Sequence, residues 1–328
     1  MSLSRSPSTV TTAHKTAVEV GIVRAVAYVD LFDYPLKPAE VHRYLPAVAA
    51  RRDLVLELLQ GELASRLLSR RDGYFMLAGR EEIAETRRRR ERVARELWPK
   101  AVEYGRLMGD LPFVRMVAVT GSVAANNADD EADIDYLLVT ANDRLWLARL
   151  FVVAIVRLAT RRGVHLCPNY LVSERAMCFE ERNLYTAREL AQMVPVAGKD
   201  LYREMWHINR WAADWLPNAQ VQLPAAASER GGPLRRPTRT LAERVLRTRI
   251  GAQLERWEMQ RKVARFSSRS EGEEVRFSGD WCKGHFEGHA ERILQAYQAR
   301  LRELKLEIED VKVAPALTER TPTWRRRR

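Results

Sequence analysis

Residues 114–140 read VRMVAVTGSVAANNADDEADIDYLLVT, and this stretch decides the fold class. One short apolar run covers residues 114–119, and a second begins at Ile134. Between them lie Gly121-Ser122 and a segment of small and acidic residues. Short β-branched runs bounded by glycine are typical of buried strands. The stretch therefore predicts two strands joined by a loop, in an α/β protein.

Asp133 and Asp135 open the second apolar run and are separated by one residue. Alternate residues of a strand share a face, so we expect both carboxylates on one side. Clustered carboxylates repel unless a cation lies between them, and Mg²⁺, or Mn²⁺ in its place, suits such oxygen ligands. Gly121 lets the backbone turn sharply towards a phosphate, to which Ser122 can donate a hydrogen bond. These features predict a metal-dependent nucleotide site.

The motif resembles the DNA polymerase beta-like nucleotidyltransferase superfamily: Gly121-Ser122, a gap of ten residues, then Asp133 and Asp135 between two apolar strands. The resemblance implies an α/β (α+β) fold whose mixed sheet is flanked by helices. It implies transfer of a nucleoside monophosphate from an NTP to an acceptor by two metal ions. Asp133 and Asp135 would bind the metals, and Gly121 and Ser122 the phosphates. The acceptor stays open between a small molecule, an RNA end and a protein hydroxyl.

The loop departs from the commonest family pattern at Ala125 and Asn126, where many members carry a basic residue and then glycine. Asn126 can still adopt a left-handed turn, and we expect it to contribute to nucleotide binding. The basic phosphate contact must come from elsewhere or be lost.

A third carboxylate normally completes such a site from a later strand, for which residues 165–173, HLCPNYLVS, are the candidate. The central polar residue of this strand is Asn169, which cannot take a proton. We expect Asn169 to orient the acceptor or a metal-bound water. Three acids of the next turn are alternative third carboxylates, although the first would face the other way on a regular strand: Glu174, Glu180 and Glu181. A catalytically degenerate protein that senses a nucleotide, or binds DNA or protein, is the alternative function.

Residues 16–80 predict a winged-helix-like module, after a disordered leader at 1–15. Helices are expected at 18–31, from about 38 and at 51–68, followed by a hairpin around Asp72-Gly73. Such modules bind DNA or dock proteins. The arginines available for phosphate contacts are Arg51, Arg52, Arg66, Arg70 and Arg71.

The net charge of +12 makes nucleic acid a candidate partner through a basic surface. Four consecutive arginines, Arg87 to Arg90, lie on a predicted linker helix at 81–110 and must spread around it. Because glutamates flank them, a solvated face is the favoured interpretation and a phosphate-attracting surface the alternative. The basic tail at 313–328 specifies no partner.

The remaining segments complete the predicted organisation. A nucleotidyltransferase core with its following helices is expected at 111–218, a linker at 219–240 and a helical region at 241–312. The helical region predicts an antiparallel pair of long helices, 241–265 and 286–311, packed on the core. His289 is expected to be solvated or to cap the second of these helices.

The chain predicts a cytoplasmic protein without a membrane partner. Its first residues lack the apolar segment of a signal peptide, and the most apolar run, 145–159, is too short to cross a bilayer. The three cysteines are widely spaced, which argues against a disulfide framework. Segments of residues 18–218 also resemble bacterial proteins that carry a nucleotidyltransferase domain, and in that group Asn169 is part of the recurring pattern.

Overall fold

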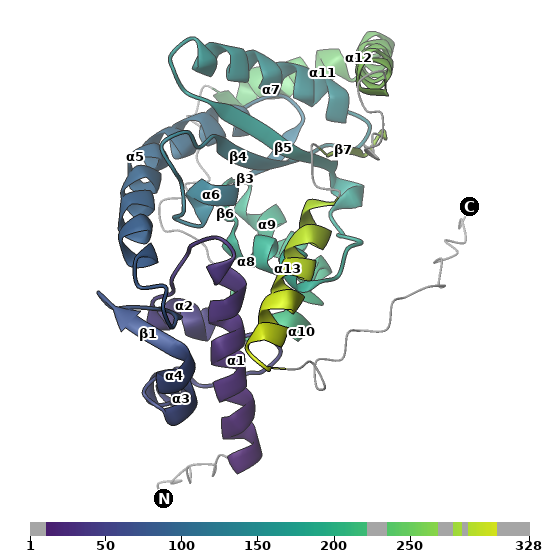
Figure 1. Cartoon of the computed structure of the whole chain (residues 1–328). Coiled ribbons are helices and arrows are strands. Elements are labelled where there is room, and N and C mark those ends of the chain that lie inside the picture. The colour runs from purple at the N-terminus through teal and green to yellow at the C-terminus, as the bar shows by residue number, and fades with distance from the viewer. Residues whose placement is uncertain (1–10, 222–234, 268–277, 284–287, 307–328) are drawn as a thin grey trace, which may run out of the picture.

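Figure 1 shows the computed structural model of the chain, which describes residues 11–221, 235–267, 278–283 and 288–306. A central sheet has the strand order β6-β3-β4-β5-β7. β4 and β5 run parallel, and the other neighbours are antiparallel, so the predicted mixed sheet flanked by helices is confirmed. The strands are β3 (Val114–Thr120), β4 (Ile134–Thr140), β5 (Leu166–Ser173), β6 (Val194–Ala197) and β7 (Trp281–Lys283).

The sheet separates two hydrophobic cores because its strands are apolar on both faces. Val117 and Val119 of β3 face one core, which α5 (Ile83–Gly109) and α7 (Leu145–Thr160) cover. Met116 and Ala118 face the other core. That second core is covered by α8 (Leu184–Gln192), α9 (Lys199–Ile208), α10 (Ala212–Trp215), α1 (Thr12–Asp30) and α13 (His289–Glu303).

The N-terminal unit has the predicted order of helices followed by a hairpin. It comprises α1, α2 (Pro38–Arg43), α3 (Arg52–Leu58), α4 (Glu62–Leu67), β1 (Leu68–Arg71) and β2 (Tyr74–Leu77). The expected third helix is split at Gln60-Gly61 into α3 and α4. Most of its buried residues belong to the same core as α8 and one face of the sheet, so the unit is packed against the sheet layer, while Tyr74 and Met76 of β2 pack with the start of α5.

The leader predicted at 1–15 is wrong from Thr11 onwards. Thr11 caps α1, and its hydroxyl accepts a hydrogen bond from the His14 amide at 3.3 Å. Such a cap satisfies one of the free amides at a helix start. Residues 1–10 lie outside the described part of the chain.

The arginine run on α5 is only partly solvated. Arg87 is 1% exposed, and its guanidinium pairs with Glu40 at 2.8 Å and Glu91 at 2.7 Å. Arg90 donates to the Phe32 carbonyl at 2.8 Å. The prediction of a solvated face is therefore wrong for Arg87 and Arg90, which hold the N-terminal unit, and correct for the exposed Arg88 and Arg89.

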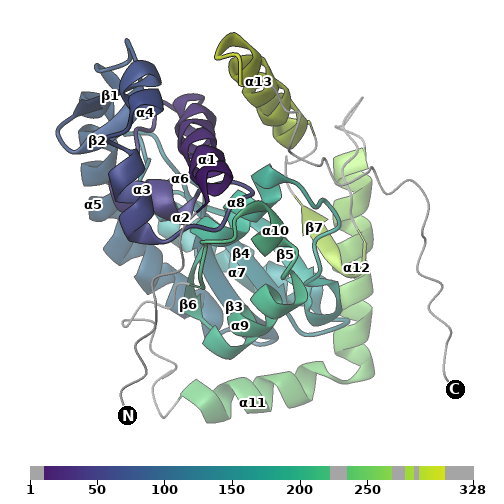
Figure 2. The ribbon, with the colours of Figure 1, turned by 90° about the horizontal axis from the view of Figure 1, so that it is seen from below.

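The C-terminal region differs most from its prediction. α11 (Arg235–Leu246) begins within the expected linker, and α12 (Arg249–Ser267) packs on α7. α13 instead contacts α1 and α8. The prediction that the two C-terminal helices form an antiparallel pair is therefore wrong. Figures 1 and 2 show α12 and α13 well apart. Ion pairing explains the position of α13, since Arg300 pairs with the buried Asp30 of α1. The predicted tail at 313–328 lies beyond the described residues.

No described helix is long and apolar enough to cross a membrane. The apolar run at 145–159 forms α7, whose buried residues face the sheet. All three cysteines carry free thiols, in agreement with the expectation from their spacing.

Candidate functional site

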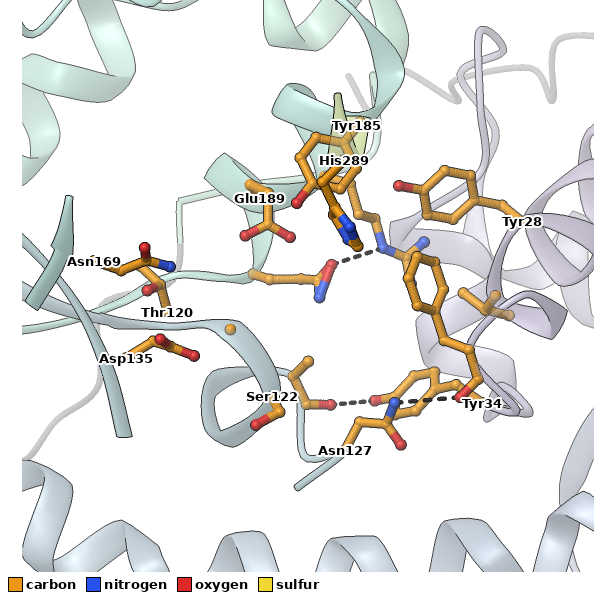
Figure 3. Close-up of a pocket in the computed structure, with 16 residues that line it drawn as sticks. Tyr28, Tyr34, Thr120, Ser122, Asn127, Asp135, Asn169, Tyr185, Glu189 and His289 are labelled. Carbon is orange, nitrogen blue, oxygen red and sulfur yellow. Dashed lines mark hydrogen bonds between the residues drawn. The ribbon is translucent and has the colours of Figure 1, made fainter. Parts of the chain in front are cut away.

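A cavity of about 310 Å³ lies between the N-terminal unit and the sheet. Its walls come from α1 and the loop after it, the bend after β3, strands β4 and β5, helix α8 and the first residue of α13. Figure 3 shows its polar side chains, with Asp135, Asn169 and Thr120 on one side and Tyr28 and Tyr34 on the other. Its size falls at the small end of ligand pockets.

Asp135 and Gly121 meet at one wall of this cavity. Antiparallel pairing of β3 with β4 sets Thr120 opposite Asp135, and Gly121 follows with a φ of 61°. A β-carbon on Gly121 would lie 2.2 Å from Oδ2 of Asp135. Only glycine permits both the left-handed backbone and this approach. The structure therefore brings together the bend and the second aspartate of the motif.

Asp133 precedes β4 and is exposed. It does not line the cavity, and its charge adds to the raised pKa of both Asp135 and Cys167. Asp133 therefore lies outside the cavity, two residues along the chain from the partly buried Asp135 that lines it.

Asn169 lines the cavity because β5 carries a bulge. Asp135 pairs with Cys167, whereas Leu137 pairs with Tyr170, so β5 has one more residue than β4 over this interval. A bulge of this kind redirects the extra residues. The structure places Asn169 with Asp135 and Ser122 around the same space.

The loop after the Gly-Ser bend is docked on the N-terminal unit. Asn126 has the expected left-handed conformation, with a φ of 55°, but it is exposed and its neighbour Asn127 lines the cavity instead. The Asn127 Oδ1 accepts from Arg90 at 3.2 Å, and the Tyr34 hydroxyl donates to the Ala125 carbonyl. The N-terminal unit and α5 therefore hold the loop after the Gly-Ser bend in place.

An unexpected acid, Glu189, enters the cavity from α8. Tyr185, Arg188, Glu189 and Gln192 line it, and their spacing of three, four and seven residues puts them on one helix face. Figure 3 shows the Glu189 carboxylate between Asn169 and Tyr185. α8 thus supplies a carboxylate at the place where the strand supplies only an amide.

Both cavity carboxylates have a raised pKa. Burial raises the pKa of Asp135 to about 6; Asp133 adds to this effect, and a hydrogen bond from the Cys167 thiol opposes it. Burial and then the charge of Asp135 raise the pKa of Glu189 to about 7, while Arg188 opposes the shift. Desolvation disfavours the charged form of an acid, and a nearby like charge does the same. A cation between these groups would relieve both effects.

The acids expected after β5 lie elsewhere. Glu174 follows β5 in a short 3₁₀ turn (Glu174–Ala176) and faces Arg115, with a closest N–O distance of 4.0 Å, next to a different cavity. Glu180 and Glu181 are exposed and do not line the site. Glu189 of α8 lines the cavity, whereas none of these three acids does.

The carboxylates fit a cation that is completed by a ligand. Among the described residues, neither Asp135 nor Glu189 forms an ion pair with a basic side chain. In the same part of the chain, no group of three or more His, Cys, Asp or Glu side chains is arranged to hold a metal ion. Mg²⁺ is commonly held by one or two carboxylates together with water and substrate phosphates. The residues present therefore suit a cation whose remaining ligands come from water or a bound anion better than a metal enclosed by protein.

Sequence reasoning also missed Arg188, His289 and the tyrosines of the N-terminal unit. The α8 segment was predicted as a helix, but a polar helix face normally meets solvent, so its spacing alone gave no reason to place it in a site. His289 was considered as a capping residue, and it lies at the start of α13 with its ring edge-on to Tyr185, 5.9 Å between centroids.

Comparisons of the chain with protein-family models, with curated proteins and with solved structures found no match. The function of this cavity must therefore be inferred from its own geometry and chemistry.

Proposed function

We propose that the protein is a metal-dependent nucleotidyltransferase that moves a nucleoside monophosphate from an NTP to an acceptor bound in the cavity. The observation that supports this most is the contact of the Asp135 carboxylate with the Gly121 bend. A bend that brings backbone amides towards a phosphate, beside an unpaired carboxylate, is the arrangement needed for a nucleotide and its metal ion.

Each residue of the site has a distinct role in this proposal. Asp135, assisted by Asp133 outside the cavity, would hold Mg²⁺ or Mn²⁺. The metal supplies charge neutralisation at the transferring phosphoryl group and at the leaving pyrophosphate. Ser122 and the amides after Gly121 would donate hydrogen bonds to phosphate oxygens, and Asn169 would orient the acceptor.

Glu189 is our candidate for the general base. It would accept the proton of the acceptor hydroxyl while that oxygen bonds to the α-phosphorus and the bond to pyrophosphate breaks. A base is most efficient when its pKa lies near the working pH, and burial raises that of Glu189 to about 7. Asn169 cannot perform this step because an amide takes no proton.

The N-terminal unit, which we propose to be winged-helix-like, would complete the site rather than read duplex DNA. Tyr28 and Tyr34 line the cavity, and the Tyr34 hydroxyl holds the loop after the bend. An NTP-consuming protein with three free thiols is suited to the cytoplasm, which is the location we propose.

A nucleotide-binding module without turnover is the second candidate. Two observations favour it: Asn169 occupies the strand position where an acid is expected, and Asp133 is exposed outside the cavity. In this case the site would bind a nucleotide with its metal ion, but it would transfer nothing.

Incubation with labelled NTPs and Mg²⁺ or Mn²⁺ separates the two candidates. The enzyme should release pyrophosphate, with label transferred to an added acceptor pool or to the protein itself, and Glu189→Gln should release far less. Binding of the nucleotide without any release by the wild-type protein would favour the module. Absence of both binding and release would contradict both candidates.

A further inference from the structure

The cavity contains a buried positive charge that the mechanism above does not use. Arg188 is 4% exposed and lines the cavity next to Glu189. Its guanidinium lies over the Tyr44 ring, 3.6 Å from the centroid, and 5.5 Å from the centroid of Tyr28. Stacking of this kind holds the planar guanidinium in a fixed position.

The hydrogen bonding of Arg188 is incomplete. Its Nε donates to Oε1 of Gln192 at 3.1 Å, which is a neutral partner. Among the residues that the structure describes, no carboxylate lies within 4.0 Å of the guanidinium nitrogens, whereas Arg87, the other arginine buried in that part of the chain, pairs with Glu40 and Glu91. Burying a charge without a close counter-ion is costly, and although the charge of Arg188 acts on Glu189, the two groups form no ion pair, so an anionic ligand could supply the missing partner.

We infer that Arg188 binds an oxyanionic group, a phosphate or a chemically similar one, of the ligand that occupies this cavity. The planar fork of a guanidinium matches phosphate geometry. The ring nitrogens of His289, on the same cavity, can add a further donor. Arg188 also offers a source for the basic contact that the loop at Ala125 and Asn126 lacks. The inference rests on the proposed function only in assigning the oxyanion to the NTP or to its acceptor.

The test is calorimetric titration of the full chain with inorganic pyrophosphate in EDTA. The wild-type protein should bind, and Arg188→Gln should bind about 10- to 100-fold more weakly, the range for a lost charge-assisted contact. Arg182→Gln is the matched control, because Arg182 is an exposed arginine just before α8 that does not line the cavity. Arg188→Lys should show an intermediate loss, since it keeps the charge without the fork.

Gln192→Glu tests the same inference without removing the stacked guanidinium. A carboxylate at this position would pair with Arg188 and repel an anion, so pyrophosphate binding should fall although the fold is retained. Equal affinity of the wild-type, Arg188→Gln and Gln192→Glu proteins would overturn the inference, as would a wild-type protein that does not bind pyrophosphate. If Arg188→Gln fails to fold, the Gln192→Glu result decides.

Two further titrations identify the source of the oxyanion. In the first titration, a non-hydrolysable NTP analogue and Mg²⁺ saturate the site before orthophosphate is added. If orthophosphate still binds through Arg188, the oxyanion belongs to an anionic acceptor. Orthophosphate displaced by the analogue would assign Arg188 to the triphosphate.

The second titration uses Asp135→Asn, which should lose the Mg²⁺-dependent binding of the analogue and retain pyrophosphate binding in EDTA. If Asp135→Asn binds both the analogue with Mg²⁺ and pyrophosphate in EDTA as tightly as the wild-type protein does, the proposed function fails while the role of Arg188 stands.

Discussion

The carboxylate of Asp135 fills the space that a side chain at residue 121 would need. A β-carbon on Gly121 would lie 2.2 Å from Oδ2 and 3.0 Å from Cγ of Asp135. The backbone of Gly121 is also left-handed, with a φ of 61°. A side chain therefore cannot be added at residue 121 without displacing the Asp135 carboxylate.

Gly121→Ala should therefore abolish Mg²⁺-dependent nucleotide binding and also lower stability. Its left-handed backbone alone costs an alanine about 1–2 kcal/mol, and the added methyl group must displace Asp135. Gly163→Ala is a close control, since Gly163 has a φ of 70° and a β-carbon there would meet nothing within 4 Å. Urea unfolding should show a lower free energy of unfolding for both variants than for the wild-type protein. Titration with an NTP analogue should show a lower affinity only for Gly121→Ala. Retained binding by Gly121→Ala would contradict the contact.

Stability should depend on pH through the buried acids. Burial raises the pKa of Glu189 from 4.5 to about 7 and that of Asp135 from 3.8 to about 6. The folded chain therefore binds more protons than the unfolded chain between about pH 4 and pH 7. The stabilising contribution of these protonated acids is complete below about pH 4 and is lost as the pH rises through 6 and 7.

Glu189→Gln should remove part of this dependence. In EDTA the variant should exceed the wild-type protein in free energy of unfolding by about 1–3 kcal/mol at pH 8, and the two should be nearly equal at pH 4. Urea unfolding across this range measures the difference. Glu204→Gln, which alters an exposed glutamate of α9, is the control. Parallel pH profiles for the wild-type and Glu189→Gln proteins would show that folding does not raise the pKa of Glu189.

Within the arginine run of α5, we expect substitution of a buried arginine to lower stability and substitution of an exposed arginine to leave it almost unchanged. Arg87 is 1% exposed, and its guanidinium lies 3.5 Å from the centroid of the Tyr34 ring and pairs with Glu40 and Glu91. Removing one partner of a buried ion pair costs about 3–5 kcal/mol, so Arg87→Ala should be strongly destabilised. Arg89→Ala, on the exposed side, should change stability by less than about 0.5 kcal/mol. Equal effects in urea unfolding would refute this expectation.

Asn169→Asp should strengthen metal binding. The variant adds a third carboxylate to the wall shared by Asp135 and Glu189. More charge in the site should tighten binding of Mn²⁺, and in EDTA the added repulsion should lower stability. Isothermal titration with Mn²⁺ and urea unfolding in EDTA measure the two effects. Asn169→Ala serves as the control, because it removes the amide without adding charge. A decrease in Mn²⁺ affinity for Asn169→Asp would place Asn169 away from the cation.

The part of the site that depends on local sequence was predictable. β3, the bend and β4 follow from short apolar runs, glycine and alternation, and these signals lie within one stretch of chain. The opposition of Thr120 and Asp135 follows from the same pairing. The order of helices and hairpin in the N-terminal unit was accessible for the same reason.

The remaining parts depend on tertiary packing, which local patterns do not encode. Glu189 and Arg188 enter the site because α8 presents a polar face to the cavity, and the same spacing describes an ordinary solvated face. Arg87 is buried because Glu40 and Glu91 neutralise it, although four adjacent arginines resemble a solvated helix. β7 has three residues and pairs with the edge of β5. A strand that short carries no periodicity to recognise.

The most direct test of the central claim is a calorimetric titration with a non-hydrolysable NTP analogue, with and without Mg²⁺. The titration compares the wild-type protein with the double variant that carries both Asp133→Ala and Asp135→Ala. If the two aspartates beside the Gly121 bend hold the metal ion, the wild-type protein binds the analogue only with Mg²⁺ and the double variant does not bind it. Equal affinity of the two proteins in Mg²⁺ would contradict the assignment of this site.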